Sequence, residues 1–96
     1  MTAPDGLEVE LYVVVSTAHL SATTAAAMTM LPIICDASEH RFRVPIASAL
    51  ESAEALPADL VALLSHVAQR APDAYGVMID CDGPVFDGLA TFDWSA

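Results

Sequence analysis

Asp80 and Asp82 are the residues whose type and spacing most suggest chemistry. They lie two positions apart, directly after an apolar run, and Gly83 follows them. Closely spaced carboxylates are typical of calcium loops, but a loop counted from Asp80 would need Gly at Val85 and Glu at Thr91. The same residues are good turn formers, because Asp tolerates turn geometry and Gly83 can adopt a positive φ. A hairpin turn is therefore the simpler interpretation.

Residues 78–83, M-I-D-C-D-G, resemble the first motif of the haloacid-dehalogenase-like phosphatases. The resemblance implies that Asp80 is a nucleophile and Asp82 an acid/base. The rest of the chain departs from that family. It has no Lys for the phosphate clamp, Pro84 stands where the family has Thr or Val, and thirteen residues follow Gly83 instead of a doubly wound domain. We therefore expect a protein without catalytic activity.

The histidines and cysteines suggest no other site. Ser16 and His19 lie three residues apart in a turn, which is not the geometry of a catalytic triad, so we expect His19 to be a hydrogen-bonded turn residue. We expect His66 to be solvated. Cys35 and Cys81 lack zinc-ligand spacing and are expected to be reduced, buried thiols. The sequence thus predicts no metal and no cofactor.

The composition indicates one globular domain. Ninety-six residues form a single domain, residues 1–96, of which residues 1–6 are expected to be frayed. Apolar residues make up 55% and the mean hydropathy is +0.53, which excludes intrinsic disorder. The longest apolar-looking run, residues 25–35, is shorter than the roughly 20 residues that cross a bilayer. With no secretory signal pattern at residues 1–6, we expect a cytoplasmic protein of a bacterial cell.

The charge points to a class of partner. The formal net charge is −10, from thirteen acids against three Arg. Residues 1–40 and residues 71–96 each carry five acids and neither Lys nor Arg. Such a chain repels nucleic acid and anionic membranes and attracts basic surfaces. We therefore expect a protein partner with a basic surface, and neither nucleic acid nor membrane.

The hydrophobic pattern predicts an α+β fold in which two helices pack on one face of a small, mainly antiparallel sheet of about four strands. Helices are expected at residues 22–31, with Ser21 as N-cap, and 57–71, with a helical turn at 48–55 that starts in a capping box at Ser48 and Glu51. Strand patterns occur at residues 7–15, 33–35, 41–46, 75–79, 85–86 and 89–94, and residues 36–40 read as a turn. The strand at 7–15 is expected to be central, and the strand at 41–46 to be an edge strand because Pro45 lacks a donor.

Two stretches carry a further resemblance. Residues 12–21, Y-V-V-V-S-T-A-H-L-S, and residues 80–94, D-C-D-G-P-V-F-D-G-L-A-T-F-D-W, are similar to a family of small uncharacterised proteins from bacterial plasmids, integrative elements and prophages. In size and acidity the chain also looks like the anti-CRISPR proteins of phages. The second likeness implies an inhibitor of a host defence complex, such as a CRISPR effector.

The leading hypothesis is therefore an inhibitor that binds a basic, nucleic-acid-handling surface by charge mimicry or steric block. If the first strand lies beside the strand at 75–79, one acidic surface could form without Lys or Arg from the same segments. Its members would be Glu8, Glu10, Asp80, Asp82, Asp87 and Asp93. Phe86, Phe92 and Trp94 could be its apolar anchors. The alternative is a homo-oligomeric structural or regulatory module, for instance a homodimer, whose acidity keeps it soluble.

Overall fold

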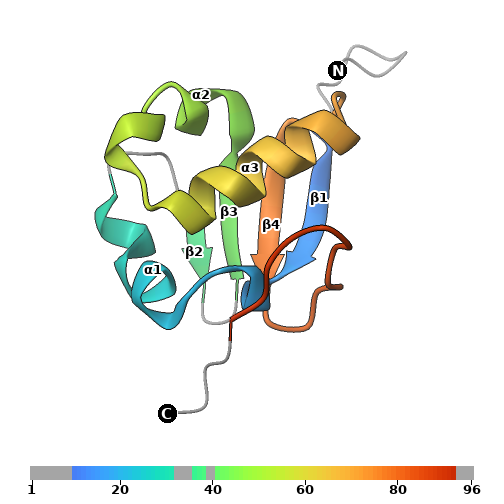
Figure 1. The fold of residues 1–96 in the computed structure, drawn as a ribbon. Coiled ribbons are helices and arrows are strands. Elements are labelled where there is room, and N and C mark those ends of the chain that lie inside the picture. The colour runs from blue at the N-terminus through green and yellow to red at the C-terminus, as the bar shows by residue number, and fades with distance from the viewer. Residues whose placement is uncertain (1–9, 32–35, 39–40, 93–96) are drawn as a thin grey trace.

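The protein folds as a four-stranded sheet with helices on one face (Figure 1). The structure, a computed structural model, describes residues 10–31, 36–38 and 41–92. The strands are β1 (Tyr12–Ser16), β2 (Asp36–Ser38), β3 (Arg41–Pro45) and β4 (Gly76–Asp80). The α-helices are α1 (Ala22–Ala27), α2 (Ile46–Leu50) and α3 (Ala58–Arg70). Three 3₁₀ helices accompany them: η1 (Thr17–His19), η2 (Met28–Met30) and η3 (Ala53–Ala55). The predicted α+β class is confirmed.

Helix α3 crosses the sheet and supplies much of the core (Figure 1). Its apolar residues recur at helical spacing, so they form one stripe, and four of them are buried: Leu60, Leu63, Leu64 and Val67. Asp59 in the first turn and Arg70 in the last complement the helix dipole. The helix predicted at residues 57–71 is confirmed.

The sheet is mainly antiparallel, with strand order β1-β4-β3-β2. β3 pairs antiparallel with both β2 and β4, whereas β1 pairs parallel with β4. Side chains alternate between the two faces of each strand. The face toward the helices carries the buried side chains Val15, Val44, Val77 and Ile79. These residues and the α3 stripe form one core.

The sequence assigned the edge and central strands wrongly. β1 was expected to be central but lies at the edge, since β4 is the strand that pairs with it in the described sheet. Val14 in its apolar run faces outward and is 41% exposed. β3 was expected at the edge but lies between β2 and β4. Pro45 is its last residue, so the missing donor falls where the ladder ends. The amide of the next residue, Ile46, donates to the carbonyl of Tyr75 over 3.0 Å.

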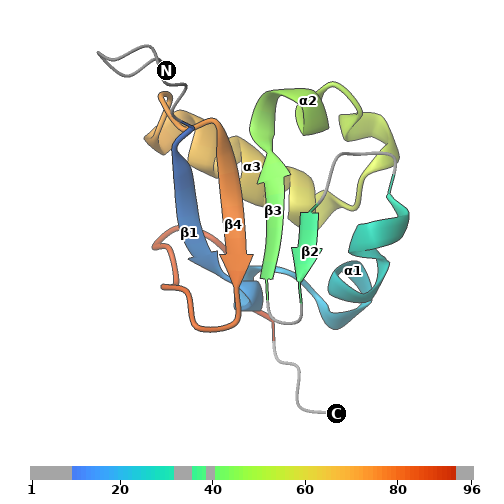
Figure 2. The same ribbon diagram turned by 180° about the vertical axis from the view of Figure 1, so that it is seen from behind.

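The opposite face of the sheet is open. Figure 2 shows the strands from this side with no helix of the described chain in front of them. By strand register, this face carries Tyr12, Val14, Arg43 and Met78. The guanidinium of Arg43 lies 5.8 Å from the centroid of the Tyr12 ring. A Cβ on Gly76 would lie 2.6 Å from Tyr12 Cε1, so glycine is what lets this ring lie against β4.

Helices α1 and α2 have bounds that differ from those predicted from the sequence. Ser21 caps α1 as expected, since its hydroxyl oxygen accepts from the Thr24 amide, but the α-helix ends at Ala27 and continues as η2. The helical turn expected from Ser48 begins earlier, as α2 at Ile46, so the predicted capping box does not start it. β2 occupies part of the predicted turn at 36–40, and the strand predicted at 33–35 lies outside the described residues.

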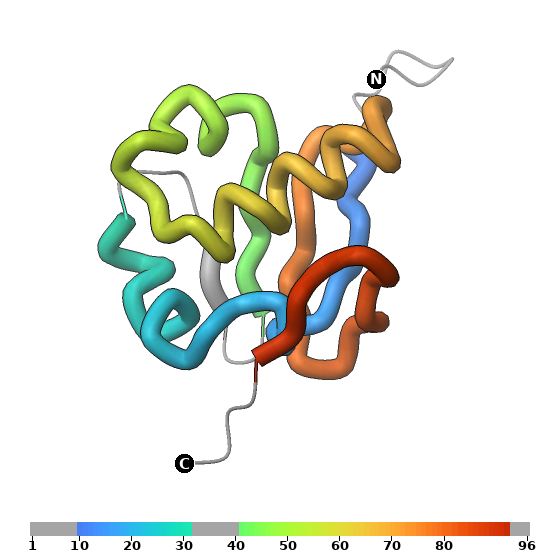
Figure 3. Tube along the Cα trace, in the orientation of Figure 1, coloured from blue at the N-terminus to red at the C-terminus, as the bar shows by residue number. Residues whose placement is uncertain are grey.

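The described chain after β4 forms no strand at the predicted positions 85–86 and 89–92, and the last two residues of the strand predicted at 89–94 lie outside the described residues. Residues 81–92, called the C-terminal segment below, contain no helix or strand. The predicted return strand at 85–86 has no place beside β4, because β1 and β3 already occupy both of its edges. Figure 3 shows the segment leaving β4, passing along β1 and returning across the chain that follows β1. No helix in the described parts of the chain is long and apolar enough to span a membrane.

Candidate functional site

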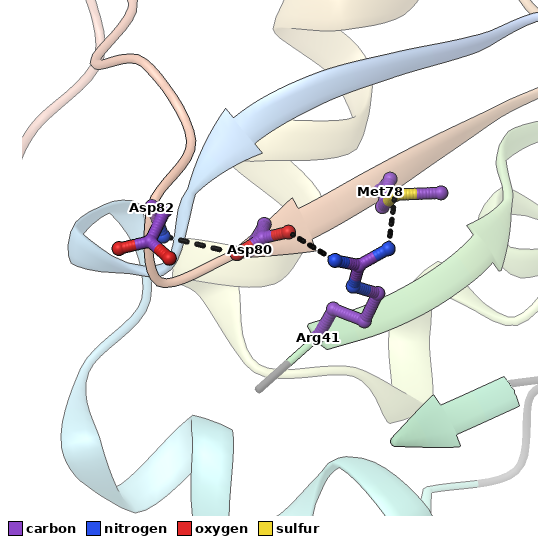
Figure 4. Close-up of polar contacts among 4 residues, drawn as sticks. All are labelled: Arg41, Met78, Asp80 and Asp82. Atoms are coloured by element: carbon purple, nitrogen blue, oxygen red, sulfur yellow. Dashed lines mark hydrogen bonds and ion pairs between the residues drawn. The ribbon is translucent and has the colours of Figure 1, made fainter. Parts of the chain in front are cut away.

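Asp80 ends β4 and forms the turn that starts the C-terminal segment (Figure 4). Its Oδ1 accepts a hydrogen bond from the amide of Asp82 over 3.0 Å, and its carbonyl accepts from the amide of Gly83 over 2.9 Å. The predicted turn is confirmed, but it is not the hairpin turn that was predicted, because no strand returns beside β4. The predicted reason for Gly83 is also wrong. In the described chain the positive-φ glycine is Gly88, with φ 89°. Gly83 is needed because a Cβ there would lie 2.5 Å from the carbonyl oxygen of Val15.

Asp80 also pairs with a basic residue of the neighbouring strand (Figure 4). Its Oδ2 lies 3.2 Å from a guanidinium nitrogen of Arg41, whose other terminal nitrogen donates to the sulfur of Met78 over 3.8 Å. Arg41 of β3 thus forms an ion pair with Asp80 of β4. Because both carboxylate oxygens of Asp80 are engaged, this geometry supports a structural role for Asp80 in the turn.

The turn contains a possible ligand set for a metal ion. One ligand atom each from Asp80, Cys81 and Asp82 lies within 4.8 Å of the others. Cys81 is exposed, which corrects the prediction that it is buried, and Cys35 lies outside the described residues. Desolvation and the negative charges of Asp82 and Asp80 raise the pKa of the Cys81 thiol. A cation bound here would have to displace the proton of the Cys81 thiol and to compete with Arg41 for the carboxylate of Asp80.

The structure brings some of the predicted acids together and separates others. Asp80 and Asp82 lie in one turn, whereas Asp82 and Asp87 are exposed on the C-terminal segment five positions apart in sequence. Glu10 precedes β1, whereas Asp82 follows β4. Since β1 and β4 are parallel, Glu10 lies at the opposite end of this strand pair from Asp82. Glu8 and Asp93 lie outside the described residues.

The predicted apolar anchors differ in their exposure. Phe86 is half-buried against the core and packs edge-on to the ring of His66, with the ring centroids 5.9 Å apart. Phe92 is 38% exposed, and Trp94 lies outside the described residues. Val85, for which the sequence predicts no role, is 58% exposed. Its place between a proline and an aromatic residue gave no signal of its exposure.

His19 joins two parts of the chain that are far apart in sequence. Its ring is 2% exposed. Nδ1 lies 2.9 Å from the carbonyl oxygen of Ala90, and Nε2 accepts from the amide of Phe86 over 2.8 Å. The prediction of a hydrogen-bonded turn residue is correct for η1, but the sequence did not reveal that the partners belong to the C-terminal segment.

His66 is also covered by the C-terminal segment, so the expectation of a solvated side chain is wrong. Its Nε2 is buried and has no hydrogen-bond partner in the structure. A Cβ on Gly88 would lie 3.3 Å from its Cε1 and 4.0 Å from a terminal nitrogen of Arg70. The segment therefore packs on the carboxyl-terminal half of α3 as well as on η1.

A small cavity separates His19 from Asp59 at the start of α3. Its volume is about 50 Å³, which is room for a few water molecules at most. The cavity is lined by His19, Asp59, Ala62, Leu89, Ala90 and Phe92. A cavity of this size is too small for a cofactor.

Residues 12–94 match the family described as a family of unknown function (DUF5983), C-terminal domain. The chain belongs to this family. The resemblance to an uncharacterised family is thereby confirmed. No curated protein and no solved structure matches the chain.

The DUF5983 match includes both stretches that carried the resemblance, residues 12–21 and 80–94. The fold joins them through backbone as well as through His19. The Ser16 amide donates to the carbonyl of Pro84 over 2.8 Å, and the Phe92 amide donates to the carbonyl of Ala18 over 2.7 Å. The described parts of these two stretches of the DUF5983 chain are therefore joined to each other.

Proposed function

We propose that this DUF5983 protein is a non-catalytic inhibitor that binds a protein partner through its C-terminal segment. The observation that carries the proposal is the exposure of Val85, at 58%, between the exposed acids Asp82 and Asp87. No Lys or Arg occurs in residues 81–92. An apolar side chain flanked by carboxylates suits a basic surface with an apolar pocket, where carboxylates meet Arg and Lys and the apolar group is desolvated.

The partner that we propose is a nucleic-acid-handling complex of host defence, such as a CRISPR effector subunit. The net charge of −10 supports a basic partner and disfavours nucleic acid or membrane. The resemblance to proteins of plasmids, integrative elements and prophages supports a mobile-element origin, and the likeness to anti-CRISPR proteins in size and acidity supports this target. On this proposal the protein acts in the bacterial cytoplasm.

The geometry reduces the set of residues that we propose as contacts with the partner. Asp80 pairs with Arg41 and holds the turn, so it positions Asp82 and is not itself a free contact. Glu10 lies at the other end of the strand pair. Phe86 is half-buried under its own segment. Asp82, Val85 and Asp87 are therefore the proposed contacts.

The test is inhibition of nucleic-acid cleavage by a purified CRISPR effector complex. We expect a variant with Asp82→Lys and Asp87→Lys to lose inhibitory potency by about tenfold or more, because each reversed charge repels the basic partner. The matched control carries Glu51→Lys and Glu54→Lys, which change the net charge equally at two exposed positions, the C-cap of α2 and η3. Equal potency of the wild type and the segment variant would refute the proposed contact. Equal loss in both variants would show that net charge alone matters.

A second candidate function is a homodimeric module that associates through the open sheet face. The observation that favours it is the exposure of Val14, at 41%, on this face. The same face carries opposite charges, Arg41 and Asp80, which suits contact with a second copy across a two-fold axis. Sedimentation of the wild type and of Val14→Asp tests this: a dimer that Val14→Asp dissociates supports it, and a wild type that stays monomeric excludes it.

A further inference from the structure

The C-terminal segment is held on the fold by a few contacts that centre on η1. Four hydrogen bonds join the segment to residues 16–19, and His19 makes two of them. The side chains of Phe86 and Leu89 pack against the core from the outside. Because residues 81–92 have no helix or strand of their own, these contacts determine where the segment lies (Figure 3).

The two hydrogen bonds of His19 require one protonation state. The carbonyl oxygen of Ala90 can only accept, so Nδ1 of His19 must carry a hydrogen. The amide of Phe86 can only donate, so Nε2 must present its lone pair. The ring is therefore neutral, with its proton on Nδ1. A protonated ring carries hydrogens on both nitrogens, and its Nε2–H would oppose the Phe86 amide at 2.8 Å.

Charged and titratable groups on α3 and on the C-terminal segment lie around His19. From α3, the acidic residue Asp59 lines the same small cavity as His19. His66, also on α3, packs against Phe86 and is a second titratable group under the segment. The segment contributes Asp87 next to Phe86, and Arg70 lies near Gly88. Helix α1, which follows η1 in the chain, carries no charged residue.

We propose that His19 is a proton-sensitive latch for the C-terminal segment. The neutral ring holds residues 84–92 against η1 and α3, and the protonated ring releases them. Release exposes the apolar side chains of Phe86 and Leu89 together with the surface of α3 around His66. This inference concerns the fold alone and does not depend on the proposed partner.

Amide hydrogen exchange of the uniformly labelled protein, followed by NMR, tests the latch. Exchange of the Phe86 and Phe92 amides is compared from about pH 7.5 to about pH 5.5, the range in which histidines change charge. After correction for intrinsic exchange, we expect protection at both amides to fall by about tenfold or more, because each loses the geometry that the neutral ring holds. The amides of Leu63 and Val77, in α3 and β4, are the internal reference and should stay protected.

Two variants separate His19 from the other titratable ring. His66→Gln keeps His19 and should show the same loss of protection as the wild type. His19→Gln cannot be charged and should show no step with pH. A step that persists in His19→Gln, or wild-type protection of Phe86 that does not change with pH, would overturn the latch. If His19→Gln does not fold, the ¹⁵N shifts of the wild-type ring decide: titration of His19 without a change at the Phe86 amide also overturns it.

Discussion

Thr24 donates its hydroxyl hydrogen to Oδ1 of Asp59 over 2.8 Å, and this bond ties the first turn of α1 to the first turn of α3. The amide of Ser21 donates to Oδ2 over 2.8 Å, and the amide of Leu60 donates to Oδ1 over 3.1 Å. Burial on its own raises the pKa of Asp59, but the hydrogen bonds from Ser21, Thr24 and Leu60 outweigh it and lower the pKa below its ordinary value. One carboxylate thus connects two helices that are 35 residues apart in sequence.

Asp59→Asn should destabilise the fold by about 1–3 kcal/mol near neutral pH, because charge-assisted hydrogen bonds are lost. A lowered folded-state pKa stabilises the fold above the unfolded pKa of about 3.9, and this contribution disappears as the pH falls through the folded value. The difference in unfolding free energy between the wild type and Asp59→Asn should therefore be constant above about pH 5 and shrink below about pH 4. Urea unfolding across this range measures it, and a difference that grows at low pH would contradict the network.

Ile79 and Met78 are neighbours in β4 that face opposite sides of the sheet. Ile79 is fully buried, so Ile79→Ala should cost about 2–5 kcal/mol of unfolding free energy through lost packing and a cavity. Met78 lies on the open face, and Met78→Ala should cost about 1 kcal/mol or less. Chemical denaturation of both variants checks this. Similar losses of unfolding free energy in the two variants would mean that the Met78 side chain is buried, and hence that the open face of the sheet is covered.

Gly83→Ala should loosen the contact between the C-terminal segment and β1. The added Cβ would lie 2.5 Å from the carbonyl oxygen of Val15, so backbone must shift, at a cost of about 1–3 kcal/mol. Thr91→Ala, an exposed change in the same segment, is the control and should stay within about 0.5 kcal/mol of the wild type. Thermal unfolding compares the two. A Gly83→Ala variant as stable as Thr91→Ala would show that the segment does not lie against β1.

His19→Leu should destabilise the protein by about 2 kcal/mol or more, because it leaves the Phe86 amide and the Ala90 carbonyl without a partner. His66→Leu is the comparison. Its Nε2 has no partner in the structure, so the change removes no hydrogen bond there and should cost about 1 kcal/mol or less. Urea denaturation near neutral pH measures both. The reverse order of the two losses would count against the role of His19.

Local physics made several elements predictable. The apolar stripe of α3 recurs at helical spacing, and Ser21 caps α1 with its own hydroxyl, so both could be derived from neighbouring residues. The turn at Asp80 likewise depends on residues within three positions of it. The α+β class followed from these patterns.

Strand order and the place of the C-terminal segment could not be derived in this way. Alternation along β1 and β3 shows which side chains share a face, but it does not say which strand lies beside which. The parallel pairing of β1 with β4 occupies the edge that a hairpin return strand would need. That pairing is what turns residues 81–92 away from the sheet.

The sequence by itself determined the fold class, the main helix, the turn at Asp80 and the strongly acidic charge, because each depends on composition or on contacts within a few residues. Only the tertiary structure decided that Asp80 pairs with Arg41, that Asp82 and Asp87 flank an exposed Val85, and that His19 holds the C-terminal segment. These relationships join residues up to 71 positions apart. Their geometry follows from the strand order, which local patterns do not encode.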